Sequence, residues 1–248
     1  MLKAQKNTLI ITERDEKLFR YLFINKVASI RHLREDIFNQ ASKQAVHRRL
    51  DKLIKYGFLE VTYLRESCNK LIYSLSKKSL VKFIGDKTQM KRIQRKSSSI
   101  PHDLGVLEIK RILSNFKSVE SALSENVLQS GLFDDEHIIK EIRKLNSDGI
   151  IKTNLGDDTF YFPLEYEASA KFAKRYDQLM HKYYGTDEVK AVLFISKTSG
   201  IQNKVMQAEK KFKGNLTPKF FYCLLDDLLT LKTKTSFINH QKEVLAIN

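Results

Sequence analysis

The chain has 248 residues, of which 42% are hydrophobic and 29% are charged, and its net charge is +15. This composition is typical of a globular chain long enough for two domains, and it excludes a largely disordered protein. No stretch approaches the roughly 18 consecutive apolar residues that span a bilayer, and residues 1–17 lack a secretory core and cleavage site, so we expect a cytoplasmic protein with no membrane partner.

The first predicted element is a helix that begins after Thr12. Thr12 and Asp15 have the spacing of a capping box, and apolar residues then recur at helical spacing, namely Leu18, Phe19, Leu22 and Phe23. A second short helix is predicted over residues 29–38, with Ile30, Leu33, Ile37 and Phe38 on one stripe. Two such helices need a third against which to bury their apolar faces.

The third predicted helix follows residues 39–42 and ends near Gly57, a residue type that commonly terminates helices. Its apolar stripe consists of Val46, Leu50, Leu53 and Ile54, and its outward set consists of Lys43, Gln44, His47, Arg48, Asp51 and Lys55. Polar and basic groups near the amino terminus of such a helix suit entry into the major groove of DNA. We take Lys43, Gln44, His47 and Arg48 as candidate base-reading residues, although a surface helix of any basic protein presents similar groups.

Two strand-like runs come next, residues 58–64 and 70–76, separated by the polar segment 65–69. Three helices followed by a hairpin is the order of a winged helix-turn-helix. Arg65 and Lys70 lie at or beside the predicted wing tip, where a cation can reach the DNA backbone. With a further amphipathic helix over 77–84, this predicted DNA-binding domain covers residues 1–86.

Charge is distributed unevenly along the chain. Residues 1–100 hold 23 Lys and Arg against 9 Asp and Glu, a net +14, whereas residues 101–248 hold 21 against 20, a net +1. An excess confined to one part of the chain favours a polyanionic partner, and we expect double-stranded DNA. Residues 87–100 are a predicted basic linker. A homodimer is expected because winged helices commonly pair on palindromic sites.

From residue 101 the pattern changes to alternating helix and strand, which predicts an α/β domain over 101–248. In chain order we expect a helix over 102–116, a strand over 119–128 and an acidic, partly helical insertion to about 144. Strands over 149–155 and 159–168 with a turn at 156–158, a helix over 169–184, a strand over 190–196, a helix over 201–212 and a strand over 219–225 follow. The predicted fold class is therefore α+β.

One group of acidic residues in this second domain could form a catalytic site. Asp148 opens one predicted strand, and Glu165 and Glu167 share one face of the next. This order of elements and acids resembles the PD-(D/E)xK nuclease-like core, and the resemblance implies that Asp148 and Glu165 would hold Mg²⁺. The sequence departs from that motif, since Ser147 replaces the proline and Glu167 stands at the lysine position. Lys171, on the predicted first turn of the following helix, is the candidate substitute lysine.

Short motifs in both domains together resemble the replication-relaxation family of plasmids and integrative elements. They are residues 12–15, Leu50 through Gly57-Phe58-Leu59, residues 73–75, 102–104 and 147–149, Glu165-Tyr166-Glu167 and residues 192–195. The resemblance implies a DNA-binding regulator or accessory protein of a mobile genetic element, acting in replication, mobilisation or transcription control. A metal-dependent DNA endonuclease targeted by the winged helix is the alternative. The first hypothesis requires no cofactor, the second requires Mg²⁺, and no small-molecule substrate is evident.

Overall fold

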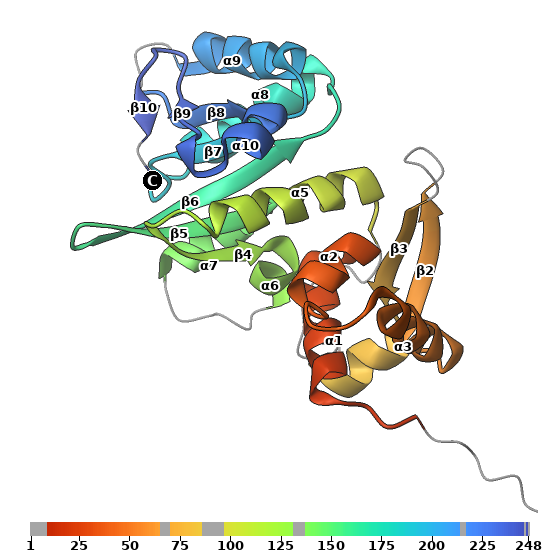
Figure 1. Ribbon diagram of the computed structural model, residues 1–248. Helices are drawn as coiled ribbons and strands as arrows, with labels where there is room; N and C mark the ends of the chain where they lie inside the picture. Colours follow the sequence, from red (N-terminus) through yellow and green to blue (C-terminus); the bar gives the residue numbers. More distant parts are fainter. Residues whose placement is uncertain are drawn as a thin grey trace, which may run out of the picture. The chain divides into compact units, whose positions relative to one another are not determined.

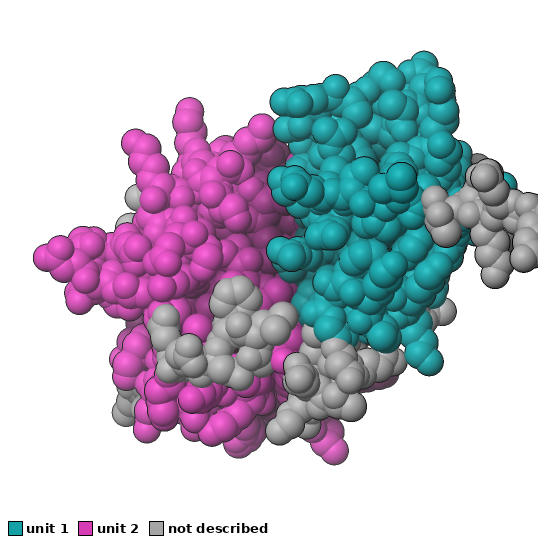
Figure 2. Space-filling view, turned by 90° about the horizontal axis from the view of Figure 1, so that it is seen from below, with its two compact units in different colours: residues 1–98 teal, residues 99–248 magenta. Residues whose placement is uncertain are grey.

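The computed structural model describes residues 9–64, 70–85, 97–130, 137–213, 217–245 and 247. Within these ranges the chain is mixed α+β, as the sequence predicts. It divides into two compact units, Met1–Ser98 and Ser99–Asn248 (Figure 2). Most of the predicted linker, 87–100, lies outside the described residues, and its last residue, Ile100, is already the first residue of a helix. No helix in the described ranges is both long and apolar enough to cross a membrane.

Unit 1 combines helices with a small antiparallel sheet in which the described strands have the order β1-β3-β2 (Figure 1). Its elements in chain order are α1 (Glu13–Asn25), β1 (Val27–Ser29), α2 (Ile30–Asp36), α3 (Lys43–Lys55), β2 (Leu59–Leu64), β3 (Lys70–Leu75), α4 (Lys77–Ser79) and the π-helical turn η1 (Leu80–Ile84). The sequence does not reveal β1, because three consecutive buried residues show no alternation.

Local signals place the helix ends of unit 1. The predicted capping box is confirmed, because the Asp15 side chain accepts from the Thr12 backbone N–H at 2.8 Å and the Thr12 hydroxyl accepts from Asp15 N. Ser29 caps α2 in the same way with His32. Gly57 follows α3 with a φ of 72°, a left-handed conformation that glycine adopts without strain. The prediction that Gly57 terminates this helix is confirmed.

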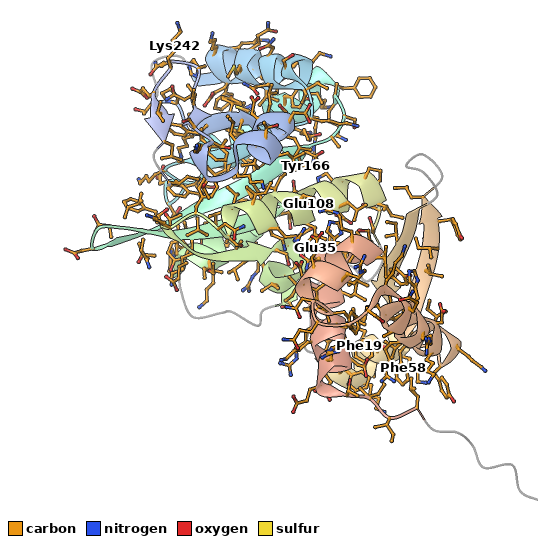
Figure 3. All side chains as sticks on the ribbon, in the orientation of Figure 1. Phe19, Glu35, Phe58, Glu108, Tyr166 and Lys242 are labelled. Atoms are coloured by element: carbon orange, nitrogen blue, oxygen red, sulfur yellow. The ribbon has the colours of Figure 1, made fainter. Side chains whose placement is uncertain are left out.

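Aromatic rings form the centre of unit 1. Phe19 of α1 lies 5.9 Å from Phe58 and 4.8 Å from Phe83 of η1, measured between ring centroids (Figure 3). Leu50 and Leu53 of α3 are fully buried in the same unit. Because these residues fix one face of α3 inward, the opposite face of the helix is directed to solvent.

Unit 2 is built on a sheet whose described strands have the order β10-β9-β8-β7-β6-β5-β4. Its elements are α5 (Ile100–Leu113), β4 (Val119–Ser124), α6 (Glu125–Ser130), α7 (His137–Lys144), β5 (Gly149–Leu155), β6 (Asp158–Glu167), α8 (Ala173–Tyr184), β7 (Val192–Ser196), α9 (Ser199–Lys213), β8 (Phe220–Leu224), α10 (Leu225–Leu231), the 3-10 turn η2 (Lys232–Lys234), β9 (Phe237–Ile238) and β10 (Val244–Leu245). The pairs β6–β7 and β7–β8 are parallel and the others are antiparallel, so the sheet is mixed.

Helices lie on both faces of this sheet (Figure 1), and each helical layer packs against it through an apolar cluster. On one face α5 and α10 contribute Ile109, Leu113 and Leu228 to a cluster with strand residues such as Leu193. On the other face α7, α8 and α9 contribute residues such as Ile142, Met180 and Val205. A helix–sheet–helix sandwich of this kind buries both faces of the central strands, which explains their nearly continuous apolar sequences.

Two predictions for unit 2 need correction. The strand predicted over 119–128 ends at Ser124, where Glu125 N donates to Asp148 O and α6 begins. The helix predicted from 169 begins only at Ala173, since Phe172 is the extended residue that precedes it. Pro163 lies in a central strand rather than at an edge, but it stands one residue before the pairing with β7 begins, where a missing N–H is tolerated.

Candidate nucleic-acid interface and acidic cluster

Helix α3 presents a polar face opposite its buried stripe. Ser42 caps the helix by accepting from Ala45 N at 3.3 Å, and Val46, Leu50 and Leu53 are fully buried. The face of α3 opposite these residues is directed to solvent, while Arg49 and Ile54 at its margins are half-buried. Of the predicted base-reading residues, Lys43, Gln44 and Arg48 are exposed and His47 is half-buried.

The exposed cations of α3 are available to an external partner. Among the described residues, no hydrogen bond or ion pair occupies the side chains of Lys43, Arg48, Lys52 or Lys55. Lys52 was not in the predicted set, although its position one turn after Arg48 places it on the same face. The face thus combines four cations with the amide of Gln44 and the carboxylate of Asp51.

Arg49 has a different role from its neighbour Arg48. Its guanidinium contacts both carboxylate oxygens of Asp15, with Nε 2.9 Å from Oδ1, and donates to Ile10 O at 2.8 Å. Asp15 is 1% exposed. Burial alone would raise the pKa of Asp15, but the hydrogen bonds from Arg49 and Thr12 outweigh it, so this pKa lies below its usual value. The pair fixes α3 against the start of α1.

The predicted hairpin is confirmed as an antiparallel pair, with a register from Leu59 opposite Leu75 to Leu64 opposite Lys70. Tyr63 and Val61 on β2 are 65% and 39% exposed. Arg65, predicted at the tip, lies outside the described residues. Lys70 begins β3, but its side chain also lies outside them.

The acidic residues predicted as a site in unit 2 form hydrogen bonds and ion pairs with other groups of the same unit. Asp148 Oδ2 accepts from Tyr166 N at 2.8 Å and lies 3.3 Å from His102 Nε2. His102 Nδ1 lies 3.4 Å from Asp103 Oδ1. Burial lowers the pKa of His102, but the two carboxylates more than compensate and raise it to about 10. His102 therefore carries a positive charge that neutralises part of this cluster.

Glu165 is held by α8. Its Oε1 atom lies 3.2 Å from Lys182 Nζ and accepts a short hydrogen bond from the Tyr183 hydroxyl. Desolvation raises the pKa of Glu165 to about 7, with Lys182 opposing and the negative charge of Asp148 contributing to the rise. The same charge of Asp148 acts on Glu167, so the three carboxylates belong to one electrostatic cluster.

Lys171 lies before α8 rather than on its predicted first turn, and its side chain reaches Glu167 rather than Glu165. It precedes α8, its backbone N–H donates to the Tyr176 hydroxyl at 2.9 Å, and its Nζ lies 3.7 Å from Glu167 and 3.2 Å from Ser169 Oγ. The lysine that contacts Glu165 is Lys182, which sequence reasoning missed. No short motif could reveal it, because Lys182 reaches Glu165 only through the packing of α8 on β6.

In the ranges that the structure describes, no group of three His, Cys, Asp or Glu side chains is arranged to hold a metal ion. The carboxylates that the nuclease resemblance assigns to Mg²⁺ have partners within the protein instead, Asp148 with His102 and Tyr166 N, and Glu165 with Lys182 and Tyr183. Comparisons of the chain with protein-family models, with curated proteins and with solved structures found no match. Membership of the replication-relaxation family and the nuclease-like core therefore stay predictions from the sequence motifs.

Proposed function

We propose that unit 1 is a winged helix-turn-helix that binds double-stranded DNA, with α3 in the major groove and the β2–β3 hairpin as the wing. The observation that carries the proposal is the face of α3 with four cations that have no partner among the described residues. A helix with apolar residues buried on one side and free cations on the other is suited to a phosphate-lined groove. The net charge of +14 over residues 1–100 supports the same partner.

Within this proposal the side chains divide by role. Lys43, Gln44, His47 and Arg48 lie on the first turns of α3 and would read base edges, while Lys52 and Lys55 near its end would contact phosphates. Arg65 and Lys70 of the wing would contact the backbone beside the site. Binding of this kind needs no cofactor. A homodimer on a palindromic site is part of the proposal, and sedimentation equilibrium of the free chain would test it.

The biological role that we propose follows the motif resemblance. The protein would be a regulator or accessory factor of a mobile genetic element, acting in replication, mobilisation or transcription control. Mapping the genomic sites that it occupies would test this role. Sites within a plasmid or integrative element would support it, whereas sites scattered over housekeeping promoters would contradict it.

The test of DNA binding begins with selection of a preferred duplex from a random pool by the full chain. Anisotropy titrations then compare Arg48→Ala with Arg20→Ala, a matched loss of one exposed arginine from α1. We expect Arg48→Ala to weaken binding about tenfold or more and Arg20→Ala to change it little. Absence of duplex affinity at low salt in the wild-type protein would contradict the proposal.

A metal-dependent endonuclease remains the second candidate, because Asp148, Glu165 and Glu167 form one electrostatic cluster in unit 2. The internal partners of these carboxylates favour a different interpretation. Lys182 and Tyr183 engage Glu165, while His102 and a backbone N–H engage Asp148. We propose that the cluster stabilises unit 2 and that this unit resembles a nuclease core without its catalysis.

A further inference from the structure

A second basic region lies within the nearly neutral C-terminal part of the chain. Residues 168–219 hold 11 Lys and Arg against 4 Asp and Glu, a net +7, so the rest of the unit carries the compensating negative charge. This segment contains α8 and α9, which pack side by side on one face of the sheet (Figure 1). One of its acids, Glu209, is fully buried and accepts hydrogen bonds from Tyr184, Tyr222 and Phe220 N. The exposed surface of the segment therefore carries a higher net positive charge than the composition of the segment indicates.

A cleft of about 330 Å³ lies between α8 and α9. Three lysines line it, Lys171, Lys204 and Lys211, against one carboxylate, that of Asp177. Lys204 and Lys211 are exposed and have no hydrogen bond or ion pair within the described part of the chain. Lys171 is paired with Glu167, so Lys204 and Lys211 are the two cations of this concave surface that can attract phosphate.

An unusual apolar side chain stands beside this cleft. Phe172 lies between the lining residues Lys171 and Ala173 in the sequence, and it is 90% exposed. Its position is fixed locally, because Lys171 N donates to the buried Tyr176 and Arg175 N donates to Phe172 O. Phe172 therefore presents an aromatic face to solvent next to the cations.

We infer that the α8–α9 cleft binds single-stranded nucleic acid, with Lys204 and Lys211 on the phosphates and Phe172 stacked on a base. Surfaces that bind single-stranded nucleic acid combine cations along the phosphate backbone with aromatic rings that stack on the bases. A duplex offers phosphates but no unstacked base, so it would use the lysines and leave Phe172 without a partner. This site lies in unit 2 and is separate from the proposed duplex-binding face of α3.

The test uses the full chain in a Lys43→Glu/Arg48→Glu/Lys52→Glu/Lys55→Glu background, which replaces all four exposed cations of the α3 face, so that its outcome is independent of the proposed duplex binding. The probe is a fluorescent thymidine oligomer of about 16 nucleotides at low salt. The variants are Lys204→Glu/Lys211→Glu and Phe172→Ala. The matched control, Lys117→Glu/Lys140→Glu, makes the same change of charge at exposed lysines outside α8 and α9.

We expect the Lys204/Lys211 variant to weaken oligomer binding more than tenfold and Phe172→Ala to weaken it about tenfold. Introduced alone into the wild-type chain, Phe172→Ala should change duplex binding little. Photocrosslinking of an oligomer that carries iodouracil should map to Phe172. All variants have exposed substitutions, and their thermal unfolding should match that of the parent.

Three results would overturn the inference. Equal losses in the cleft and control variants would show that binding follows overall charge. If Phe172→Ala bound the oligomer with wild-type affinity and the crosslinks mapped to other residues, Phe172 would have no stacking role. The proposed preference for single strands would then also be wrong. Binding to phosphatidylserine vesicles that is lost in the same variants, without oligomer binding, would assign the surface to a membrane.

Discussion

Arg49 of α3 and Asp15 of α1, 34 residues apart in the sequence, form an ion pair in unit 1 that joins the two helices. The immediate neighbour of Arg49, Arg48, is exposed and has no partner among the described residues. Arg49 thus positions the helix, and Arg48 is available for the proposed contact with DNA. The two residues allow stability and binding to be separated experimentally.

Replacing Arg49 with alanine should destabilise unit 1 by about 3 kcal/mol, because the buried carboxylate of Asp15 loses its counterion. Replacing Arg48 with alanine should change the free energy of unfolding by less than about 0.5 kcal/mol, as expected for an exposed residue. Urea unfolding of the two variants, followed by circular dichroism, measures both values. Equal stability of the two variants would show that the Asp15–Arg49 pair contributes nothing.

Loss of Lys52 or Lys55 should weaken DNA binding uniformly, since phosphate contacts carry no sequence information. For each contact removed, the slope of log K against log salt concentration should become shallower by about 0.9. Arg48→Ala should instead reduce the preference for the selected duplex over a scrambled one. Anisotropy titrations at several salt concentrations distinguish these outcomes, and an unchanged slope in Lys55→Ala would exclude this phosphate contact.

His102 should remain protonated well above neutral pH, because Asp103 and Asp148 raise its pKa to about 10. Since this pKa exceeds the usual histidine value of 6.5, the ion pairs of His102 stabilise the folded state fully below pH 6.5. This stabilisation is lost as the pH rises towards 10. Asp148→Asn should lower the pKa of His102. NMR titration of the imidazole resonance, assigned with His102→Gln, gives the value directly, and a midpoint near 6.5 would contradict the predicted ion pairs.

Gly105 on α5 is required for the close approach of this helix to β6. A Cβ atom at Gly105 would lie 2.3 Å from Cε1 of Tyr166, which is buried under the helix (Figure 3). Gly105→Ala should therefore destabilise unit 2 by about 1–3 kcal/mol. Gly200→Ala in α9 is the control, because the nearest atom is 4.0 Å away and alanine favours a helix. Thermal unfolding should place the two variants on opposite sides of the wild type.

Metal-dependent cleavage of DNA is not expected. Incubation of supercoiled plasmid with the protein and Mn²⁺ should leave it intact, because Lys182, Tyr183 and His102 already engage the carboxylates of Glu165 and Asp148. Nicking by the wild type that disappears in both Asp148→Ala and Glu165→Ala would contradict this prediction and favour the endonuclease. Nicking that persists in both variants would come from a contaminant.

Local patterns in the sequence determine much of the secondary structure. The capping box of Thr12 and Asp15, the apolar stripe of α3 and the glycine at 57 act within a few residues, so their outcome can be predicted without knowledge of the fold. The outward position of Lys43, Gln44 and Arg48 follows from the period of the same helix. The hairpins β2–β3 and β5–β6 are local in the same sense.

Tertiary structure alone decides which side chains meet across elements. The sequence places Glu165 and Glu167 on one strand face and offers Lys171, from the start of the next predicted helix, as the substitute lysine. In the structure Lys171 contacts Glu167, but Glu165 pairs with Lys182, and Lys171 also lines a cleft with Lys204 and Lys211. These neighbours depend on the direction in which α8 crosses the sheet and on its contact with α9. Contacts of that kind arise from the packing of whole apolar faces, which no short motif encodes.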